Sequence, residues 1–420
     1  MTITTTDIKP RIEAANTDAV ARLTSGDPVL VDVAPAGEVV RGLEDRMILH
    51  AGPPLAWDRM CGALRGSAIG LAMFERWAET PEEAEKLLAR GEIRLAPNHA
   101  HGGVGPMAGT TSRSLPVFIV EDRAHGTRAY CRPAEDRQQF GDHSAKALAT
   151  LTAWRDVFGP SLGAAIRHMG GLALRPLMAK ALLMGDELHN RPVAASSLFA
   201  NAMAPALVES GLGHDAVLAT LRLLAGHELL FLSLSMAAGK ATADAAHGIE
   251  HSTIVTAMAR NGTEFGIRVS GLGDQWFTAP APQIDALFLP GYGAADAGLD
   301  MGDSAITETM GFGGFVLPGA LAILALVGGS QEQVTAWSRQ MREITAGTHT
   351  AYRLPALGFA GAPVGIDIRK VVKTGITPVI DTAVAHREAG HPIIGSGVVR
   401  APLAPFTTAL EAFARAHGID

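Results

Sequence analysis

The chain has 420 residues, of which 47% are apolar and 18% are charged. A composition this apolar supports a folded core and excludes an intrinsically disordered chain. The net charge of −7 comes from acidic and basic residues mixed along the sequence, so no basic stripe is available for a phosphate backbone. We therefore expect a globular protein of roughly two to four domains that does not bind nucleic acid.

The sequence also indicates the cellular compartment of the protein. Its only cysteines are Cys61 and Cys131, and residues 1–10 are polar, unlike the apolar centre of a signal peptide. Residues 309–330 are uncharged and as long as a membrane span, but Pro318 and several glycines interrupt the apolar run. We expect a reduced, cytoplasmic protein with a buried helix near Ala320 and no membrane span.

Residues 1–140 show alternating helix and strand patterns, which are typical of an α/β domain. A helix is expected at residues 14–25. A second helix begins at Pro81, where Thr80 can cap the free amides and Glu83 can complete a capping box. Strands are expected at residues 28–34, 46–50, 92–96, 115–121 and 128–132.

The pattern changes after residue 140. Residues 141–250 hold long Ala-, Leu- and Met-rich runs with helical spacing, which predict a mainly helical domain. Residues 251–420 predict a mixed α/β domain with glycine-rich loops. The expected fold class is α/β in the mixed α+β sense. Helices are expected at 147–157, 172–184, 194–209, 229–246, 331–344 and 405–417, and strands at 253–258, 266–270, 284–289, 364–369 and 378–384.

Two histidines open a glycine-rich segment after a predicted strand. In an extended chain, His99 and His101 would point to one face and could clamp a metal or present two imidazoles to an anion. The glycines at residues 102–109 would let backbone amides approach a ligand closely. A histidine-bearing turn is the simpler alternative, but α/β proteins often place sites at strand ends.

A second polar cluster lies at the end of a predicted apolar helix. The spacing of Asp186, His189 and Asn190 would place them on one helical face. Arg191 precedes a proline that is expected to open the next helix, and its planar guanidinium suits a carboxylate or phosphate. A solvated helix end would explain the same charges.

Other candidates are scattered along the chain. Lys240 is a lone cation in an apolar stretch, where an amine either extends to solvent or is held at a site. Asp367 and Arg369 would share a strand face and could simply pair with each other. The remaining candidates follow strands or precede a glycine loop, and are Arg260, Asn261, Asp303 and Thr307.

Several common catalytic motifs are missing from the sequence. There is no Gly-x-Ser-x-Gly elbow, no phosphate loop, no dinucleotide fingerprint and no Cys-x-x-Cys pair. The polar residues that remain are arginines, amides, histidines and glycine turns. This set suits a small planar anion better than a nucleotide or a polymer.

Nine strings spread along the sequence form a recognisable set. They are PVLVDVAP at 28–35, RMILHAGPP at 46–54, WDRMCG at 57–62, VGPMAG at 104–109, MGDELHNR at 184–191, LSMAAGK at 234–240, MARNGT at 258–263, GDSAITET at 302–309 and GIDIRK at 365–370. Together they resemble the YlbE/AllG family of bacterial proteins, over nearly the whole chain from about residue 15. Two places depart from the family pattern, namely residues 98–101 (Asn-His-Ala-His) and 226–228 (Gly-His-Glu), which leaves a different carbamoyl or amide substrate open.

The resemblance implies a subunit of oxamate carbamoyltransferase, in anaerobic allantoin degradation. That enzyme converts oxalurate and phosphate to oxamate and carbamoyl phosphate, in a complex with a succinyl-CoA-synthetase-like partner. Arg191 and Arg260 would hold the carboxylate or phosphate, and His99, His101 and His189 would polarise the carbamoyl oxygen or move protons. No cofactor or metal is expected.

Two other functions stay open. A metal-dependent amide hydrolase would use His99 and His101 with His189, His227 and Asp303 as ligands. A binding subunit would hold an anion without performing chemistry.

The sequence also favours an oligomer. The apolar helices and low aromatic content suit burial against another subunit, so we expect at least a homodimer.

Overall fold

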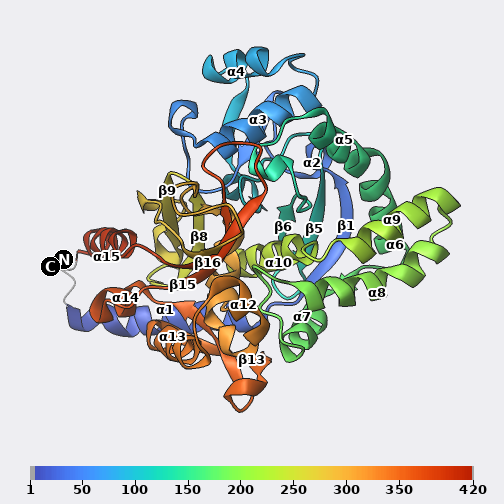
Figure 1. Cartoon of the computed structure of the whole chain (residues 1–420). Coiled ribbons are helices and arrows are strands. Elements are labelled where there is room, and N and C mark those ends of the chain that lie inside the picture. Colours follow the sequence, from blue (N-terminus) through green and yellow to red (C-terminus); the bar gives the residue numbers. More distant parts are fainter. Residues whose placement is uncertain (1–4, 419–420) are drawn as a thin grey trace.

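The computed structural model describes residues 5–418 and has a mixed α/β fold, as predicted (Figure 1). The helices are α1 Thr5–Ser25, α2 Ala36–Val39, α3 Gly62–Phe74, α4 Pro81–Ala89, α5 Ala145–Ala153, α6 Gly159–His168, α7 Leu174–Leu183, α8 Val193–Glu209, α9 His214–Gly226, α10 Phe231–Ala245, α11 Ile306–Thr309, α12 Leu324–Val327, α13 Gln331–Ile344, α14 Ile368–Thr374 and α15 Ala404–Ala416. The strands are β1 Pro28–Pro35, β2 Met47–His50, β3 Arg94–Pro97, β4 Gly103–Val104, β5 Pro116–Asp122, β6 Thr127–Cys131, β7 Leu172–Ala173, β8 Val255–Asn261, β9 Glu264–Val269, β10 Phe277–Pro280, β11 Asp285–Phe288, β12 Met301–Gly302, β13 Thr345–Leu354, β14 Ala360–Ile366, β15 Val379–Ala385 and β16 Ile393–Arg400.

The largest sheet has the strand order β4-β6-β5-β1-β7. Most of its neighbours are antiparallel, and β4 pairs parallel with β6. Helix α10 packs against β5 and β6, and α6 packs against β1. Strand β5 is buried at nearly every position, so both of its faces are covered, which explains its nearly continuous apolar run.

Two further sheets come from the C-terminal part of the chain. The order β10-β9-β8-β12 forms an antiparallel sheet, and β11-β16-β15 forms another. Helix α10 contacts β8 and α11 as well as the first sheet, so it lies between the two halves of the molecule. This position explains why nearly every residue of α10 is buried.

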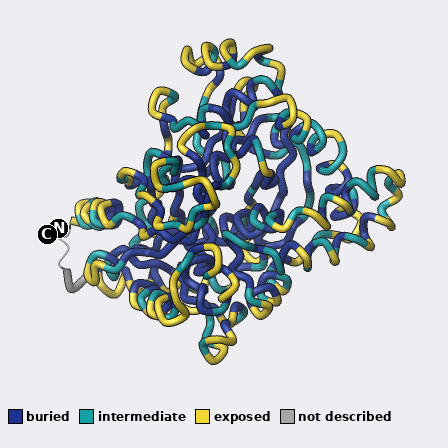
Figure 2. The backbone as a smooth tube through the Cα atoms, viewed as in Figure 1, coloured by how far each residue is buried: buried dark blue, intermediate teal, exposed yellow. Residues whose placement is uncertain are grey.

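One large hydrophobic cluster extends through the molecule. It contains Leu30, Phe199 and Phe406, one from each of the three ranges predicted as domains. In Figure 2 the buried segments converge in the middle of the molecule, and exposed segments lie at its edges, including α4. The division at residues 140 and 250 stays a prediction.

The apolar segment at residues 309–330 forms short helical turns instead of one helix. Two 3₁₀ turns flank Ala320, and the α-helical part is only α12. Across residues 5–418, no single helix has the length and apolarity needed to cross a membrane. Helices α9 and α10 meet that test only as a pair, with a bend of 82° between them.

Local signals in the sequence predict helix ends well. The Thr80 hydroxyl accepts the Glu83 amide at 3.2 Å, and Pro81 is the first residue of α4. The Glu83 carboxylate accepts the Glu79 amide instead of the Thr80 amide, so the reciprocal bond is displaced by one residue. The cap therefore forms as predicted, with a shifted partner.

The predicted strand at residues 364–369 is partly wrong. Strand β14 ends at Ile366, and Asp367 caps α14 by accepting the Arg369 amide at 3.0 Å. Arg369 therefore lies in a helix and does not share a strand face with Asp367. The predicted pairing is nevertheless confirmed, because Arg369 Nη2 lies 2.6 Å from Asp367 Oδ2.

The carboxylate of Asp303 holds several distant segments together. It accepts hydrogen bonds from the Gly52 amide (2.7 Å), the Gly105 amide (2.8 Å) and Asn98 Nδ2 (3.0 Å), and it is fully buried. Burial raises the pKa of Asp303 to about 7, although these donors and Arg260 act in the opposite direction. Asp303 thus has a structural role that its sequence position did not reveal.

We predict that Asp303→Asn lowers the free energy of unfolding by about 2–4 kcal/mol, because one acceptor oxygen becomes an NH₂ group facing N–H donors. Urea unfolding of the full chain measures this loss. The matched control is Asp58→Asn, an exposed position where the change should stay within about 0.5 kcal/mol. Equal stability of the two variants would contradict the structural role.

A buried histidine gives a second prediction, on pH. His349 lies in β13 and its Nε2 donates to the Met310 carbonyl at 3.0 Å. Burial lowers its pKa to about 4. Between that value and the unfolded pKa of about 6.5, only the unfolded state is protonated, so His349 costs stability as pH falls, at roughly 1.4 kcal/mol per pH unit.

The variant His349→Gln removes this titration and leaves the other histidines in place. Its stability deficit relative to the wild type should therefore shrink as pH falls from about 6.5 to about 4. Urea unfolding of both proteins across this pH range measures the difference. A deficit that does not change with pH would contradict the lowered pKa.

Candidate active site

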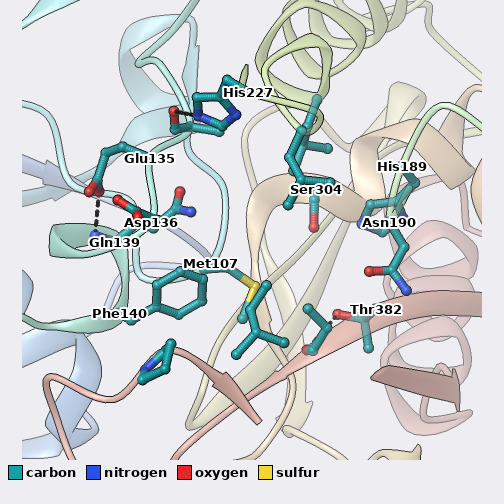
Figure 3. Close-up of a pocket in the computed structure, with 16 residues that line it drawn as sticks. Met107, Glu135, Asp136, Gln139, Phe140, His189, Asn190, His227, Ser304 and Thr382 are labelled. Atoms are coloured by element: carbon teal, nitrogen blue, oxygen red, sulfur yellow. Dashed lines mark hydrogen bonds between the residues drawn. The ribbon is translucent and has the colours of Figure 1, made fainter. Parts of the chain in front are cut away.

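A cavity of about 190 Å³ lies between the segment after β6, the loop from α7 to α8, the start of α10 and strand β15. This is smaller than the roughly 300–1,000 Å³ of pockets that hold drug-sized ligands, so it suits a small metabolite. In Figure 3, Glu135, Gln139 and His227 lie on one side of the pocket, and His189, Asn190, Ser304 and Thr382 lie on the other. The lining residues are Met107, Ala134, Glu135, Asp136, Gln139, Phe140, His189, Asn190, His227, Leu229, Leu232, Ser304, Thr382, Ala383, Pro392 and Ile393.

The loop that carries His189 is organised by its own acidic side chains. Helix α7 ends at Leu183, and the Asp186 carboxylate accepts the Leu188 amide at 2.8 Å and the Ala195 amide at 2.9 Å. Because residues 186–190 are not helical, the predicted common helical face of Asp186, His189 and Asn190 is wrong. The carboxylates instead satisfy backbone donors that no helix pairs.

Glu187 completes this loop. Its carboxylate accepts the amides of His189 (2.7 Å), Asn190 (3.1 Å) and Arg191. Burial and the charges of two neighbouring carboxyl groups raise the pKa of Glu187 well above its usual range. The backbone that presents His189 and Asn190 to the cavity is therefore fixed by a buried acid.

His189 pairs with two buried carboxyl groups from distant segments. Its Nδ1 lies 2.7 Å from Glu308 Oε1 and 3.4 Å from Asp381 Oδ1. Burial alone would lower the pKa of His189, but the Glu308 and Asp381 carboxyl groups together outweigh it and the pKa rises to about 10. Burial also raises the pKa of Asp381 to about 6. His189 Nε2 has no hydrogen bond within residues 5–418, so the ring has a free N–H at a residue that lines the cavity.

Two amide side chains at the cavity wall have unused hydrogen-bonding groups. Asn190 Nδ2 and Gln139 Oε1 are buried and have no partner in the described part of the chain. Leaving such groups unpaired costs about 1–3 kcal/mol each, so a ligand that pairs with them gains affinity. One donor and one acceptor are the complement of an amide or ureido group.

Arg260 lies behind the wall of the cavity and does not line it. Its guanidinium pairs with Asp300 at 2.8 Å and 3.0 Å, and it donates to Ser304 Oγ (3.3 Å) and Thr382 Oγ1 (3.2 Å). Both hydroxyls belong to lining residues. Arg260 therefore orients two hydroxyls of the cavity wall, and its predicted contact with an anion stays a prediction.

The predicted pairing of His99 and His101 on one face is wrong. Residues Asn98–His101 form a 3₁₀ turn, not an extended chain. His99 is buried edge-on against Trp276, with Nε2 3.6 Å from Asp303, and burial lowers its pKa far below the usual value. His101 instead contacts the Arg41 carbonyl in a separate surface groove. Neither histidine lines the cavity.

Three further candidates have structural contacts, and a fourth, Arg191, is unpaired in the described chain. Lys240 is buried and pairs with Asp244 one helical turn away, so it does not extend to solvent. Asn261 accepts two turn amides, and Thr307 donates to the Ser304 carbonyl at 2.7 Å. The Arg191 guanidinium is half-buried and has no partner within residues 5–418, and Arg191 directly follows the lining residue Asn190.

Sequence reasoning missed Gln139, Glu308 and Asp381. Glu308 lay inside a highlighted string but was not singled out. Asp381 is the one charged residue of β15, an otherwise uncharged and mostly buried strand, and a lone carboxylate in a buried run is a signal that could have been used. Gln139 belongs to a short 3₁₀ turn and carries no such signal.

A family model and a sequence relative relate this chain to the same group of proteins. The family model of the oxamate carbamoyltransferase subunit AllG matches residues 93–304. The AllG subunit of Escherichia coli K12 is 42% identical over 416 residues, covering 97% of this chain and 99% of that protein. The chain belongs to the AllG family.

Two other proteins are similar to this chain over most of its length. The uncharacterized protein YahG of Escherichia coli K12 is 44% identical over 412 residues, covering 97% of this chain and 87% of YahG. A crystal structure of a conserved protein of unknown function from Enterococcus faecalis V583 superposes with a TM-score of 0.96 at 40% identity, covering 97% of this chain and 99% of that one. Within this AllG fold, the family match includes the cavity wall from Met107 to Ser304 but not the part contributed by β15.

Proposed function

We propose that the protein transfers a carbamoyl group on a small ureido or amide acid, as an enzyme or as a subunit of one. The substrate pair that fits best is oxalurate and phosphate, which give oxamate and carbamoyl phosphate. The observation that carries the proposal is a small cavity whose wall holds an unpaired amide donor, an unpaired amide acceptor and a protonated imidazole. The 42% identity to an oxamate carbamoyltransferase subunit supports it.

The chemistry needs few groups from the protein. A phosphate oxygen attacks the carbamoyl carbon of oxalurate, and the bond from that carbon to the inner nitrogen breaks. The proton of the attacking hydrogen phosphate ends on this nitrogen, which becomes the amide nitrogen of oxamate. His189 Nε2–H can donate to the carbamoyl oxygen as negative charge develops there, which stabilises the tetrahedral intermediate.

The other residues have positioning roles in this proposal. Asn190 and Gln139 pair with the amide or ureido edge, which fixes the carbamoyl group relative to His189. Arg191 offers an unpaired guanidinium beside the cavity for a carboxylate or phosphate. We also propose that the chain acts with partner subunits, because the relative AllG is by name a subunit. The family resemblance favours a succinyl-CoA-synthetase-like partner, and the apolar helices favour a homodimer.

The activity is tested by mixing the purified chain with oxalurate and phosphate, alone and with the proteins encoded beside its gene. Carbamoyl phosphate should form in at least one mixture. Binding of oxamate without turnover in every mixture would indicate a non-catalytic binding subunit. Absence of both binding and turnover would contradict the proposal.

Asn190→Ala should weaken oxamate binding roughly tenfold to a hundredfold, which corresponds to about 1–3 kcal/mol for one buried hydrogen bond. Titration calorimetry measures the change. The matched control is Asn201→Ala, which removes the same side chain from an exposed position on α8 and should leave binding unchanged. Equal effects of the two substitutions would remove Asn190 from the site.

Arg191→Lys keeps the charge but loses the planar fork. Because this guanidinium has no ion pair in the described chain, we expect the thermal midpoint to change little. Ligand binding should weaken by about 1.5–3 kcal/mol, the range of charge-assisted hydrogen bonds. Normal binding combined with a much lower melting temperature would show that Arg191 is structural.

A further inference from the structure

Two buried carboxyl groups, Glu308 and Asp381, share a single histidine, His189. The neighbouring acids Asp186 and Glu187 are also buried, but backbone amides satisfy their carboxyl groups. Within residues 5–418, neither Glu308 nor Asp381 has an ion pair with any other residue. Buried charges are normally paired or bound to a metal, and here two carboxyl groups have one imidazole between them.

Asp381 is the clearest sign of a missing partner. It is fully buried, and neither of its carboxylate oxygens has a hydrogen-bond partner in the described chain. The Glu308 carboxylate, by contrast, accepts from His189 Nδ1 and from the Gly314 amide at 3.0 Å. A carboxylate this deeply buried needs either a proton or a cation beside it.

The donor atoms have the spacing of metal ligands. One atom from each of His189, Glu308 and Asp381 lies within 4.8 Å of the others. The separations of 2.7 Å and 3.4 Å from Nδ1 bracket the roughly 3.0 Å expected between adjacent ligands of an octahedral ion with bonds of about 2.1 Å. Metal binding would replace only the Nδ1 proton and leave Nε2–H facing the cavity.

Gly313 closes the other side of this group. A Cβ at this position would collide with Glu308 Oε1 and lie 2.8 Å from Asp381 Oδ1, so only glycine fits. Its φ of +56° is also a conformation that glycine adopts freely. The cluster is therefore enclosed by backbone on this side and borders the cavity through His189.

We propose that His189, Glu308 and Asp381 bind one divalent transition-metal ion at the wall of the cavity. Two carboxylate oxygens and one imidazole nitrogen suit Mn²⁺ or Zn²⁺ better than a soft metal. The site differs from the His99 and His101 clamp considered from the sequence. It does not depend on the proposed carbamoyl transfer, since the ion would bind without substrate.

The test uses the full chain stripped with a chelator and titrated with micromolar Mn²⁺ in the absence of substrate, with free Mn²⁺ followed by electron paramagnetic resonance. One ion should bind per chain. Asp381→Asn and Glu308→Gln, each checked for folding by circular dichroism, should both weaken binding by about tenfold or more. If neither variant folds, the test uses the wild type alone. Bound metal in the purified protein and a higher melting temperature with Mn²⁺ would then support the site.

A second group of possible ligands, His386, Glu388 and His391, provides the control, because it lies in the loop between β15 and β16. His391→Gln removes a donor there and should leave Mn²⁺ binding unchanged. Loss of binding in His391→Gln with normal binding in Asp381→Asn would place the ion in the loop and overturn the proposal. Failure of the wild type to bind Mn²⁺ and Zn²⁺ would overturn it as well, and would indicate a proton shared between Glu308 and Asp381.

Discussion

The arrangement of the cavity depends on the hydrogen bonds to Asp303. This carboxylate joins the loop after β2, the turn after β3, the glycine-rich segment near Gly105 and the end of β12. Two lining residues of the cavity lie close to these contacts in the chain. Met107 is two residues after Gly105, and Ser304 directly follows Asp303. Backbone segments can approach this closely only because residues such as Gly52 and Gly302 have no side chain at the contact.

Buried charged residues also hold the other wall of the cavity in place. Glu187 fixes the backbone of the loop that carries His189, and Glu308 fixes the ring of His189. Arg260, paired with Asp300, orients two hydroxyls of the wall from behind. The side chains that face the cavity are therefore held by groups that do not touch it, which is how pre-organised sites keep their geometry.

The elements of the fold follow well from the sequence, because apolar spacing and caps are local signals. Helix α13 and strand β1 have nearly the predicted bounds, and Thr80 caps α4. The residues of the candidate site were harder to predict from the sequence, because tertiary contacts bring them together. His189 and Asn190 were predicted for their residue types, but the reason given, a shared helical face, was wrong.

His99 shows why such errors occur. Its string looks catalytic in an extended chain, but a 3₁₀ turn buries His99 against Trp276 and sends His101 to another surface. Asp381 shows the opposite error, since a single acid in a strand attracts little notice until its neighbours are known. Spacing along the chain predicts distance only inside regular structure.

The cavity wall runs from Met107 to Ile393, so its parts are made far apart in time as well as in sequence. A growing chain on the ribosome can form the first sheet and helices α5 to α9 early, because domains tend to fold in order of synthesis. It cannot form the complete wall until β15 and the start of β16 have emerged. Ligand capture is therefore delayed until nearly the whole chain has been synthesised, and truncated products would lack a complete site.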